Sequence, residues 1–323
     1  MTTSAQTTAG GATSARSTRD DAVAFLVMTA LFAAAPLAVY PFFMMQALCF
    51  ALFACAFNLL IGYVGLLSFG HAMFLGTGGY LSAHAARVWG LSPELSILCG
   101  VVGSTVLGAV TGALAIRRQG IYFAMITLAL SQMIYFFYLE APFTHGEDGI
   151  QGVPQGRLFG LVSLSDPWTL YYFVLAVFLF GFLAIYRTVN SPFGEVLKAV
   201  CENEPRAISL GYRVDRYKLA AFVLSAALSG LAGGTKAIVA QNASLTDVHY
   251  IMSGEVVLMT LLGGMGTIYG PVVGALILVA MQNYLAQYGQ WVTIIQGAIF
   301  IICVLLFRRG VVGEIAHRFK LSL

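Results

Sequence analysis

The chain has 323 residues, of which 59% are hydrophobic and 10% are charged, and its formal net charge is +3. Soluble domains carry about 25% charged residues, so a shortfall spread along the whole chain excludes a soluble protein and indicates an all-α, polytopic helical membrane protein in a lipid bilayer. The small net charge does not suggest nucleic acid as a partner, and the apolar runs are continuous where a β-barrel would show alternation.

The two ends of the chain are more polar than its middle. Residues 1–20 are rich in Ser, Thr, Ala and Gly, which predicts a disordered cytoplasmic tail. Residues 21–310 are predicted to form one transmembrane domain, followed by a cytoplasmic C-terminal tail at 311–323. The five cysteines contain no CxxC pair, so neither a disulfide framework nor a metal site is expected.

Apolar runs of roughly 20 residues, the length that crosses a bilayer, recur about ten times. The predicted spans are 22–40, 42–63, 66–86, 94–116, 120–139, 168–186, 218–239, 250–265, 267–286 and 291–307. The third contains His71 and many small residues, so we expect it to be broken or partly re-entrant. Ten crossings place both ends of the chain on the same side of the membrane.

Basic residues concentrate on one side of this topology. Arg117 and Arg118 follow the fourth span, and five more basic residues lie in the loop 187–217. The opposite side carries two basic residues and five acids. The positive-inside rule therefore predicts that both termini and the loop 187–217 are cytoplasmic, and that the loop 140–167 is periplasmic. This outer loop is rich in Gly and Pro, and it is either a plain connection or a contact for a soluble partner.

Small residues recur every four positions in several spans, on one face of each helix. They are Gly100, Ser104, Gly108 and Gly112, then Gly230 and Gly234, then Gly266, Gly270 and Gly274. Such faces let helix backbones approach closely. They pack either the chain's own helices or a subunit interface.

Two glycine-studded segments interrupt the spans, "GYVGLLSFGHAMFLGTGGY" and "GGMGTIYGPVVGALI". Paired interruptions of this kind are typical of transporter repeats and indicate a pathway between them. Phe69, His71 and Glu255, which come from these two parts of the chain, are the candidate translocation-pathway residues. His71 and Glu255 are also ionisable, and ionisable side chains are costly within a span. The alternatives are a packing role for His71 and a structural, hydrogen-bonded acid at Glu255.

A polar stretch, "GEVLKAVCENEPRAISLGYRVDRYK", lies between the sixth and seventh spans. Ser191 as N-cap and Pro192 at the first helical position predict a short amphipathic helix. Asn203 or Glu204 is expected to cap a second helix, which ends at Gly211 with positive φ. A capped helix pair suits a docking surface for a soluble protein. A helix lying on lipid would favour a polar face rich in Lys and Arg, whereas this one contains acids.

Catalytic motifs such as HExxH and GxSxG are missing from the sequence, and so is a P-loop. The chain is therefore predicted to be no enzyme, to have no catalytic residues and to bind no cofactor itself. If it moves a solute with ATP, then ATP and Mg²⁺ are bound by partner subunits.

Several long motifs then resemble one family. "NLLIGYVGLLSFGHAMFLGTGGYLSA", "GIYFAMITLALSQMIYFF", "HGEDGIQGVP", "ENEPRAISLGYRVDRYKLAAFVLSAALSGLAGG" and "SGEVVLMTLLGGMGTIYGPVVGA" appear in this order. They resemble LivM-type subunits of the branched-chain amino acid ABC transporter permease family, over roughly residues 50–310.

The resemblance implies a permease subunit of an ATP-binding cassette importer in the bacterial inner membrane. Its implied partners are a LivH-like companion permease, two cytoplasmic ABC ATPases and a periplasmic substrate-binding protein. The family's substrates are branched-chain amino acids, while related importers carry urea, amides or aromatic acids. The alternative function is a secondary, ion-coupled transporter or channel that needs no ATPase.

The resemblance also implies that the loop 187–217 is the coupling loop. The coupling residues assigned in it are Glu195, Leu197, Glu202, Asn203, Arg206, Ala207 and Gly211. We expect the apolar Leu197 and Ala207 to fill a groove on the ATPase, with Glu202 and Arg206 at the rim of that contact.

Overall fold

The computed structural model describes residues 23–285 apart from positions 38, 159 and 161, together with 294–298, 300–301, 310 and 312–314. Within these residues, five helices are long and apolar enough to cross a membrane: α2 (Pro41–Ile61), α4 (Pro93–Ala115), α5 (Ile121–Glu140), α6 (Pro167–Val189) and α9 (Val214–Ala240). Shorter helices are Val23–Leu37, which ends in η1 (Ala35–Leu37), α3 (His71–Arg87), α10 (Tyr250–Gly263) and α11 (Gly270–Leu285).

Each of the first nine predicted spans coincides with one of these helices, which confirms the polytopic helical fold. The tenth, 291–307, lies largely outside the described residues, and so do the tail 1–20 and most of the tail 311–323. The third span begins only at His71, because the preceding segment 62–70 is irregular and contains Gly65 at a φ of 76°.

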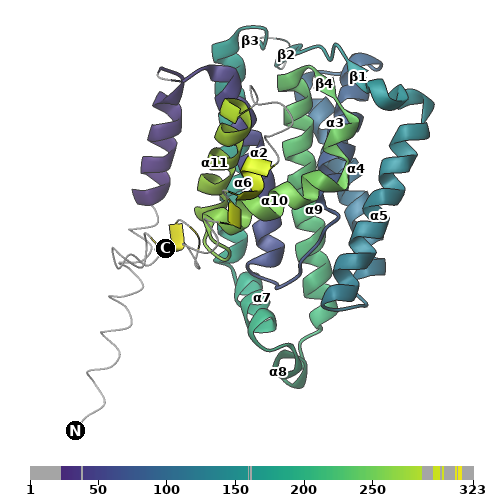
Figure 1. Ribbon diagram of the computed structural model, residues 1–323, viewed down its shortest axis with the longest axis vertical. Helices are drawn as coiled ribbons and strands as arrows, with labels where there is room; N and C mark the ends of the chain where they lie inside the picture. Colours follow the sequence, from purple (N-terminus) through teal and green to yellow (C-terminus); the bar gives the residue numbers. More distant parts are fainter. Residues whose placement is uncertain are drawn as a thin grey trace.

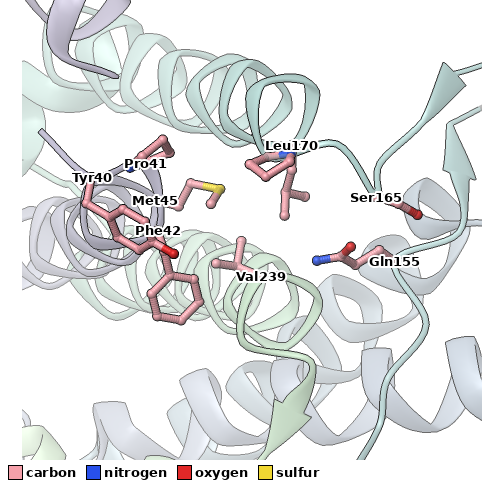
Figure 2. Close-up of a pocket in the computed structure, with 9 residues that line it drawn as sticks. Tyr40, Pro41, Phe42, Met45, Gln155, Ser165, Leu170 and Val239 are labelled. Atoms are coloured by element: carbon pink, nitrogen blue, oxygen red, sulfur yellow. The ribbon is translucent and has the colours of Figure 1, made fainter. Parts of the chain in front are cut away.

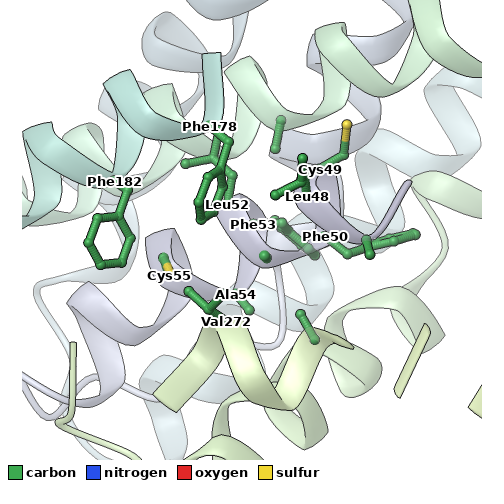
Figure 3. Packing of buried hydrophobic residues seen from close by; sticks show 14 of the residues in the cluster. Leu48, Cys49, Phe50, Leu52, Phe53, Ala54, Cys55, Phe178, Phe182 and Val272 are labelled. Atoms are coloured by element: carbon green, nitrogen blue, oxygen red, sulfur yellow. The ribbon is translucent and has the colours of Figure 1, made fainter. Parts of the chain in front are cut away.

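Helix α2 lies at the centre of the molecule (Figure 1). Nearly every side chain from Met44 to Leu60 is buried, and α2 packs against α6, α9, α10 and α11. Figure 3 shows Leu52 and Phe53 of α2 between Phe178 of α6 and Val272 of α11. A helix that is apolar all round is stable only when other helices or lipid surround it, and here other helices do.

Helix α4 instead presents an apolar stripe outward. Leu98, Val102 and Val106 recur at a spacing of four residues, and each is more than half exposed. An exposed aliphatic stripe on a spanning helix is the surface that lipid solvates, so α4 lies at the periphery of the chain.

The small residues pack the chain's own helices. A Cβ added at Gly78 of α3 would collide with the backbone of Gly230 in α9, and one at Gly112 of α4 would lie 2.8 Å from the ring of Phe222. Helices α3, α4 and α9 thus meet at the glycine faces, where their backbones pack closely. Of the two interpretations of these stripes, the structure supports internal packing.

The two ends of the helical bundle differ in character (Figure 1). One end carries two short antiparallel ribbons, in which β1 (Ile150–Gln151) pairs with β4 (Asn242–Ala243) and β2 (Arg157–Leu158) pairs with β3 (Val162–Ser163). It also holds η2 (Pro142–Thr144), η3 (Gly146–Asp148) and η4 (Leu245–Asp247). We call it the ribbon end.

The opposite end carries α7 (Pro192–Glu202) and α8 (Glu204–Ser209), which protrude beyond the bundle. The loops 140–167 and 187–217 therefore lie at opposite ends of the molecule, as the alternating topology requires.

Candidate functional site

The α7–α8 element (residues 191–213) is built by local capping chemistry. The Ser191 hydroxyl accepts a hydrogen bond from the Gly194 amide at 3.3 Å, and Pro192 occupies the first helical position. The Asn203 side chain accepts one from the Arg206 amide at 3.1 Å, which makes Asn203 the cap of α8. Both caps satisfy donors that would otherwise lack partners, so these short helices keep a fixed shape.

Gly211 ends α8 in a Schellman motif. Its φ is 89°, its amide donates to Ile208 O at 2.9 Å, and the Tyr212 amide donates to Ala207 O at 3.2 Å. Glycine adopts this left-handed conformation without steric cost, whereas a β-branched residue does not. The prediction that Gly211 ends the second helix with positive φ is confirmed.

Leu197 and Ala207 point into the chain itself. Leu197 is 0% exposed and belongs to the buried cluster that includes Leu60, Val64 and Leu66. Ala207 is 2% exposed and packs with Val200 and Val214. The expectation that these two side chains fill a groove on a partner is therefore wrong, because neither has solvent-accessible surface that a partner could contact.

The exposed apolar residues of the element are others. Ile208 is 56% exposed, Leu210 is 70% exposed and Tyr212 is 43% exposed, and all three lie on α8 or the turn that follows it. Large apolar side chains in water at a protruding tip mark an interaction surface. Ala207 faces inward, and the next residue, Ile208, therefore lies on another face of α8. The helical periodicity of α8 was the signal in the sequence that could have identified this surface.

An open groove of about 570 Å³ lies beside this tip. It is lined by Asn190, Ser191, Pro192, Glu195, Val196, Ala199 and Tyr212. Glu195 also forms an exposed ion pair with Lys198 at 2.9 Å, and Glu202, Asn203 and Arg206 are exposed. The charged members of the predicted coupling set, Glu195, Glu202 and Arg206, are thus exposed on the same element as the apolar tip.

Glu204 ties the element to two other parts of the bundle. Its Oε1 accepts from Lys218 Nζ at 2.7 Å and from Gln119 Nε2 at 2.9 Å. Lys218 lies in the first turns of α9 and its side chain is 4% exposed, while Gln119 lies in the turn between α4 and α5. A charge-assisted bond shielded from water holds α8 in a fixed position relative to α9. Sequence reasoning treated Glu204 only as a possible cap.

Cys201 is the point where α7 meets the irregular segment before α3. Its Sγ lies close enough to Gly65 that a Cβ there would be 3.1 Å away. Burial, together with the neighbouring Glu202 carboxylate, raises the pKa of the Cys201 thiol.

The two glycine-studded segments do approach one another. Asn58 of α2 donates from Nδ2 to Thr267 O at 2.9 Å and accepts at Oδ1 from the Gly266 amide at 3.1 Å. The Ala72 amide of α3 donates to the Ser253 hydroxyl of α10 at 2.9 Å. Asn58 and Ser253, which the sequence did not single out, thus connect each segment to the helix beside the other. The segments themselves also meet, since a Cβ added at Gly62 would lie 2.7 Å from the Gly266 amide nitrogen.

His71 occupies a closed aromatic site. It is 0% exposed, its Nε2 lies 2.9 Å from Ser225 Oγ, and its ring contacts Phe57 and Phe74 edge-on. Of the two interpretations of His71, this environment favours packing. The Phe69 amide donates to Thr127 Oγ1 of α5 at 3.2 Å, and its side chain is partly exposed.

Glu255 lies apart from His71. Its Oε2 accepts from Gln282 Nε2 of α11 at 2.9 Å. Ser253, which bonds α3, is two positions away on α10, and residues two apart face different sides of a helix. The structure therefore brings the two segments together without bringing the side chains of His71 and Glu255 together.

A pocket of about 340 Å³ opens at the ribbon end (Figure 2). Tyr40, Phe42 and Met45 of the α2 region face Leu170 of α6 and Val239 of α9, with Gln155 and Ser165 at the side. These lining residues are uncharged, so the pocket suits an apolar group.

Comparison with known proteins agrees with this architecture. Residues 39–304 match the family model described as "Branched-chain amino acid transport system / permease component". The chain is 26% identical over 289 residues to the high-affinity branched-chain amino acid transport system permease protein LivM of Salmonella typhimurium, covering 82% of this chain and 68% of that one.

Two further relatives differ in name. The chain is 24% identical over 232 residues to a probable branched-chain amino acid transport permease protein LivH of Methanocaldococcus jannaschii, covering 68% of this chain and 72% of that one. It is 26% identical over 276 residues to the ribose import permease protein RbsC of Bacillus subtilis, covering 76% and 81%. No solved structure is a significant match.

The family model spans most of the bundle, including the α7–α8 element, and the relatives are transport subunits, which favours a permease over a secondary transporter or channel. The chain belongs to the family of permease components of branched-chain amino acid transport systems.

Proposed function

We propose that this permease is driven by cytoplasmic ABC ATPases that dock on the α7–α8 element. The observation that carries the proposal is the tip formed by Ile208, Leu210 and Tyr212, which exposes apolar surface outside the membrane bundle. Buried anchors rather than rim charges supply most of the energy of a protein interface. The exposed Glu202 and Arg206 therefore set register, and the tip supplies affinity.

The α7–α8 element is suited to transmit a rigid-body displacement to the membrane helices because it is firmly packed against them. Leu197 anchors α7 in the cluster that contains Leu60 at the end of α2, and Glu204 holds α8 to Lys218 of α9 and to Gln119. A displacement of the tip must therefore move α2 and α9 with it, since closely packed protein interiors have low compressibility.

The orientation we propose places the α7–α8 element and both termini in the cytoplasm of a bacterium, with the ribbon end in the periplasm. The basic residues near α7 and α8 support this orientation. A LivH-like companion permease completes the membrane part, a periplasmic binding protein delivers the solute to the ribbon end, and ATP and Mg²⁺ bind to the ATPase subunits.

The substrate we propose is a branched-chain amino acid or a related small polar solute. The LivM relative supports this choice, since its printed name gives that substrate class.

The test co-expresses the chain with its companion permease and ATPases and compares two matched variants. Leu210→Asp should lose the ATPases on purification and lose ATP-dependent uptake in vesicles. Val162→Asp, which places the same charge at an apolar residue 46% exposed in β3, at the opposite end of the molecule, should keep the ATPases on purification. Uptake by the wild type that is driven by an ion gradient without ATP would refute the proposal.

A further inference from the structure

Three ionisable side chains lie together in the half of the bundle nearer the ribbon end. Lys236 of α9 forms an ion pair with Asp247 of η4, and the two side chains are 13% and 12% exposed. The Lys236 ammonium also lies 5.0 Å from the centre of the Phe50 ring. Lys236 and Asp247 therefore neutralise each other.

Glu255 is the remaining charge of this group. The fields of Lys236 and Asp247 reach its carboxylate, but none of the ion pairs among the described residues includes it. Its hydrogen bond comes from the Gln282 amide, a neutral donor on the next helix. A carboxylate at membrane depth is expensive unless a cation or water meets it.

The Glu255–Gln282 pair is partly exposed and lies beside open surface. Ile251, one helical turn before Glu255 and on the same face of α10, is 55% exposed. Hydrocarbon cannot satisfy the hydrogen-bonding groups of a carboxylate and an amide, so the pair has capacity left for a polar ligand.

We propose that Glu255 and Gln282 form the subsite that binds the ammonium group of the translocated solute. The inference rests on the proposed function, and it assigns the solute to the class that carries a cationic amine. An ammonium donates three hydrogen bonds, and the Glu255 carboxylate and the Gln282 carbonyl oxygen are acceptors on adjacent helices. The uncharged pocket in Figure 2 lacks such a partner.

The first experiment measures uptake of L-leucine and hydrolysis of ATP in proteoliposomes that contain the full transporter and its loaded binding protein. Glu255→Gln should lower leucine uptake per ATP about tenfold or more, the effect of losing one charge-assisted hydrogen bond, while stimulated ATP hydrolysis persists. Glu255→Asp should recover much of the uptake. Glu314→Gln, which removes a partly exposed acid outside the membrane spans and outside the loop 187–217, should leave both activities unchanged.

The second experiment tests the ammonium directly and does not depend on the binding protein. In a transporter without its native cysteines, Ile251→Cys is labelled with a maleimide. L-Leucine and isopentylamine, which carry the ammonium, should slow the labelling. 2-Hydroxy-4-methylpentanoate, which lacks it, should not, and Glu255→Gln should abolish the protection.

The outcomes separate the two proposals. A wild-type complex that neither hydrolyses ATP in response to the binding protein nor transports leucine refutes the proposed function. A wild-type complex that transports, combined with a Glu255→Gln variant within about twofold of it, refutes the subsite alone. Should Glu255→Gln fail to assemble, the exchange Glu255→Gln with Gln282→Glu keeps one carboxylate in the pair and should restore assembly and uptake. Equal protection by the amine and the hydroxy acid also overturns the subsite.

Discussion

Leu197→Ala and Leu210→Ala make the same chemical change in one short element and should have opposite consequences. Leu197 is 0% exposed in the cluster that joins α7 to the end of α2, whereas Leu210 is 70% exposed at the tip. Truncating a fully buried leucine costs about 2–5 kcal/mol, because a cavity remains. Truncating an exposed one changes stability by no more than about 0.5 kcal/mol.

The cost at Leu197 should appear as loosening of α7 from the bundle. Hydrogen exchange of the α7 amides in the purified complex should speed up by at least about 30-fold, which corresponds to the lower bound of 2 kcal/mol. Leu210→Ala should leave this exchange unchanged and instead reduce the amount of ATPase that co-purifies. The reasoning is refuted if Leu197→Ala leaves exchange unchanged, or if Leu210→Ala loosens α7 while retaining the ATPases.

Three further perturbations follow from the same geometry. Lys218→Met leaves the Glu204 carboxylate without its cation and should lower the free energy of unfolding by about 1.5–3 kcal/mol, measured by thermal denaturation in detergent. The double variant Lys218→Met with Glu204→Gln should recover part of this loss, and losses that simply add would contradict the pairing. Gly211→Val forces a β-branched residue to a φ of 89° at a cost of about 1–3 kcal/mol and should reduce the amount of ATPase that co-purifies, whereas Gly211→Asn should reduce it less. If the Val variant recovers as much ATPase as the wild type, the Schellman turn is not required. Because the pKa of the Cys201 thiol is raised, its thiolate fraction near neutral pH is lower than that of free cysteine, and maleimide labelling should keep accelerating as the pH rises past about 8.5. Glu202→Gln should speed labelling at neutral pH, and a pH profile of labelling identical to that of free cysteine would contradict the raised pKa.

Local chemistry made the shape of the α7–α8 element predictable. The caps at Ser191 and Asn203 and the left-handed Gly211 each depend on neighbours within a few residues, and all three are found in the structure. The helical spans were predictable for a similar reason, since length and hydropathy are local properties.

The direction in which the element faces was not predictable in the same way. Periodicity placed Leu197 on an apolar stripe, but the residues that share its cluster, such as Leu60 and Val64, lie more than 130 positions earlier in the chain. A stripe identifies the apolar side of a helix and not what covers it. The stripe was assigned to a partner, and the chain itself covers it.

The candidate pathway was predictable to a similar extent. The glycine-studded segments indicated that residues near 62–80 and 263–277 meet, and the bonds of Asn58 to Thr267 and Gly266 join them. The partners of individual polar side chains, such as Ser225 for His71 and Gln282 for Glu255, come from other helices and depend on the tertiary packing.

The central claim, that ATP-driven force enters through the tip of the α7–α8 element, is tested most directly by site-specific photocrosslinking in the assembled complex. A photoreactive amino acid at Leu210 should crosslink to an ATPase subunit, with a yield that changes when ATP is bound, while the same group at Val106 on the outer face of α4 should crosslink to no ATPase. Absence of an ATPase crosslink from Ile208, Leu210 and Tyr212 in a complex that transports would contradict the account.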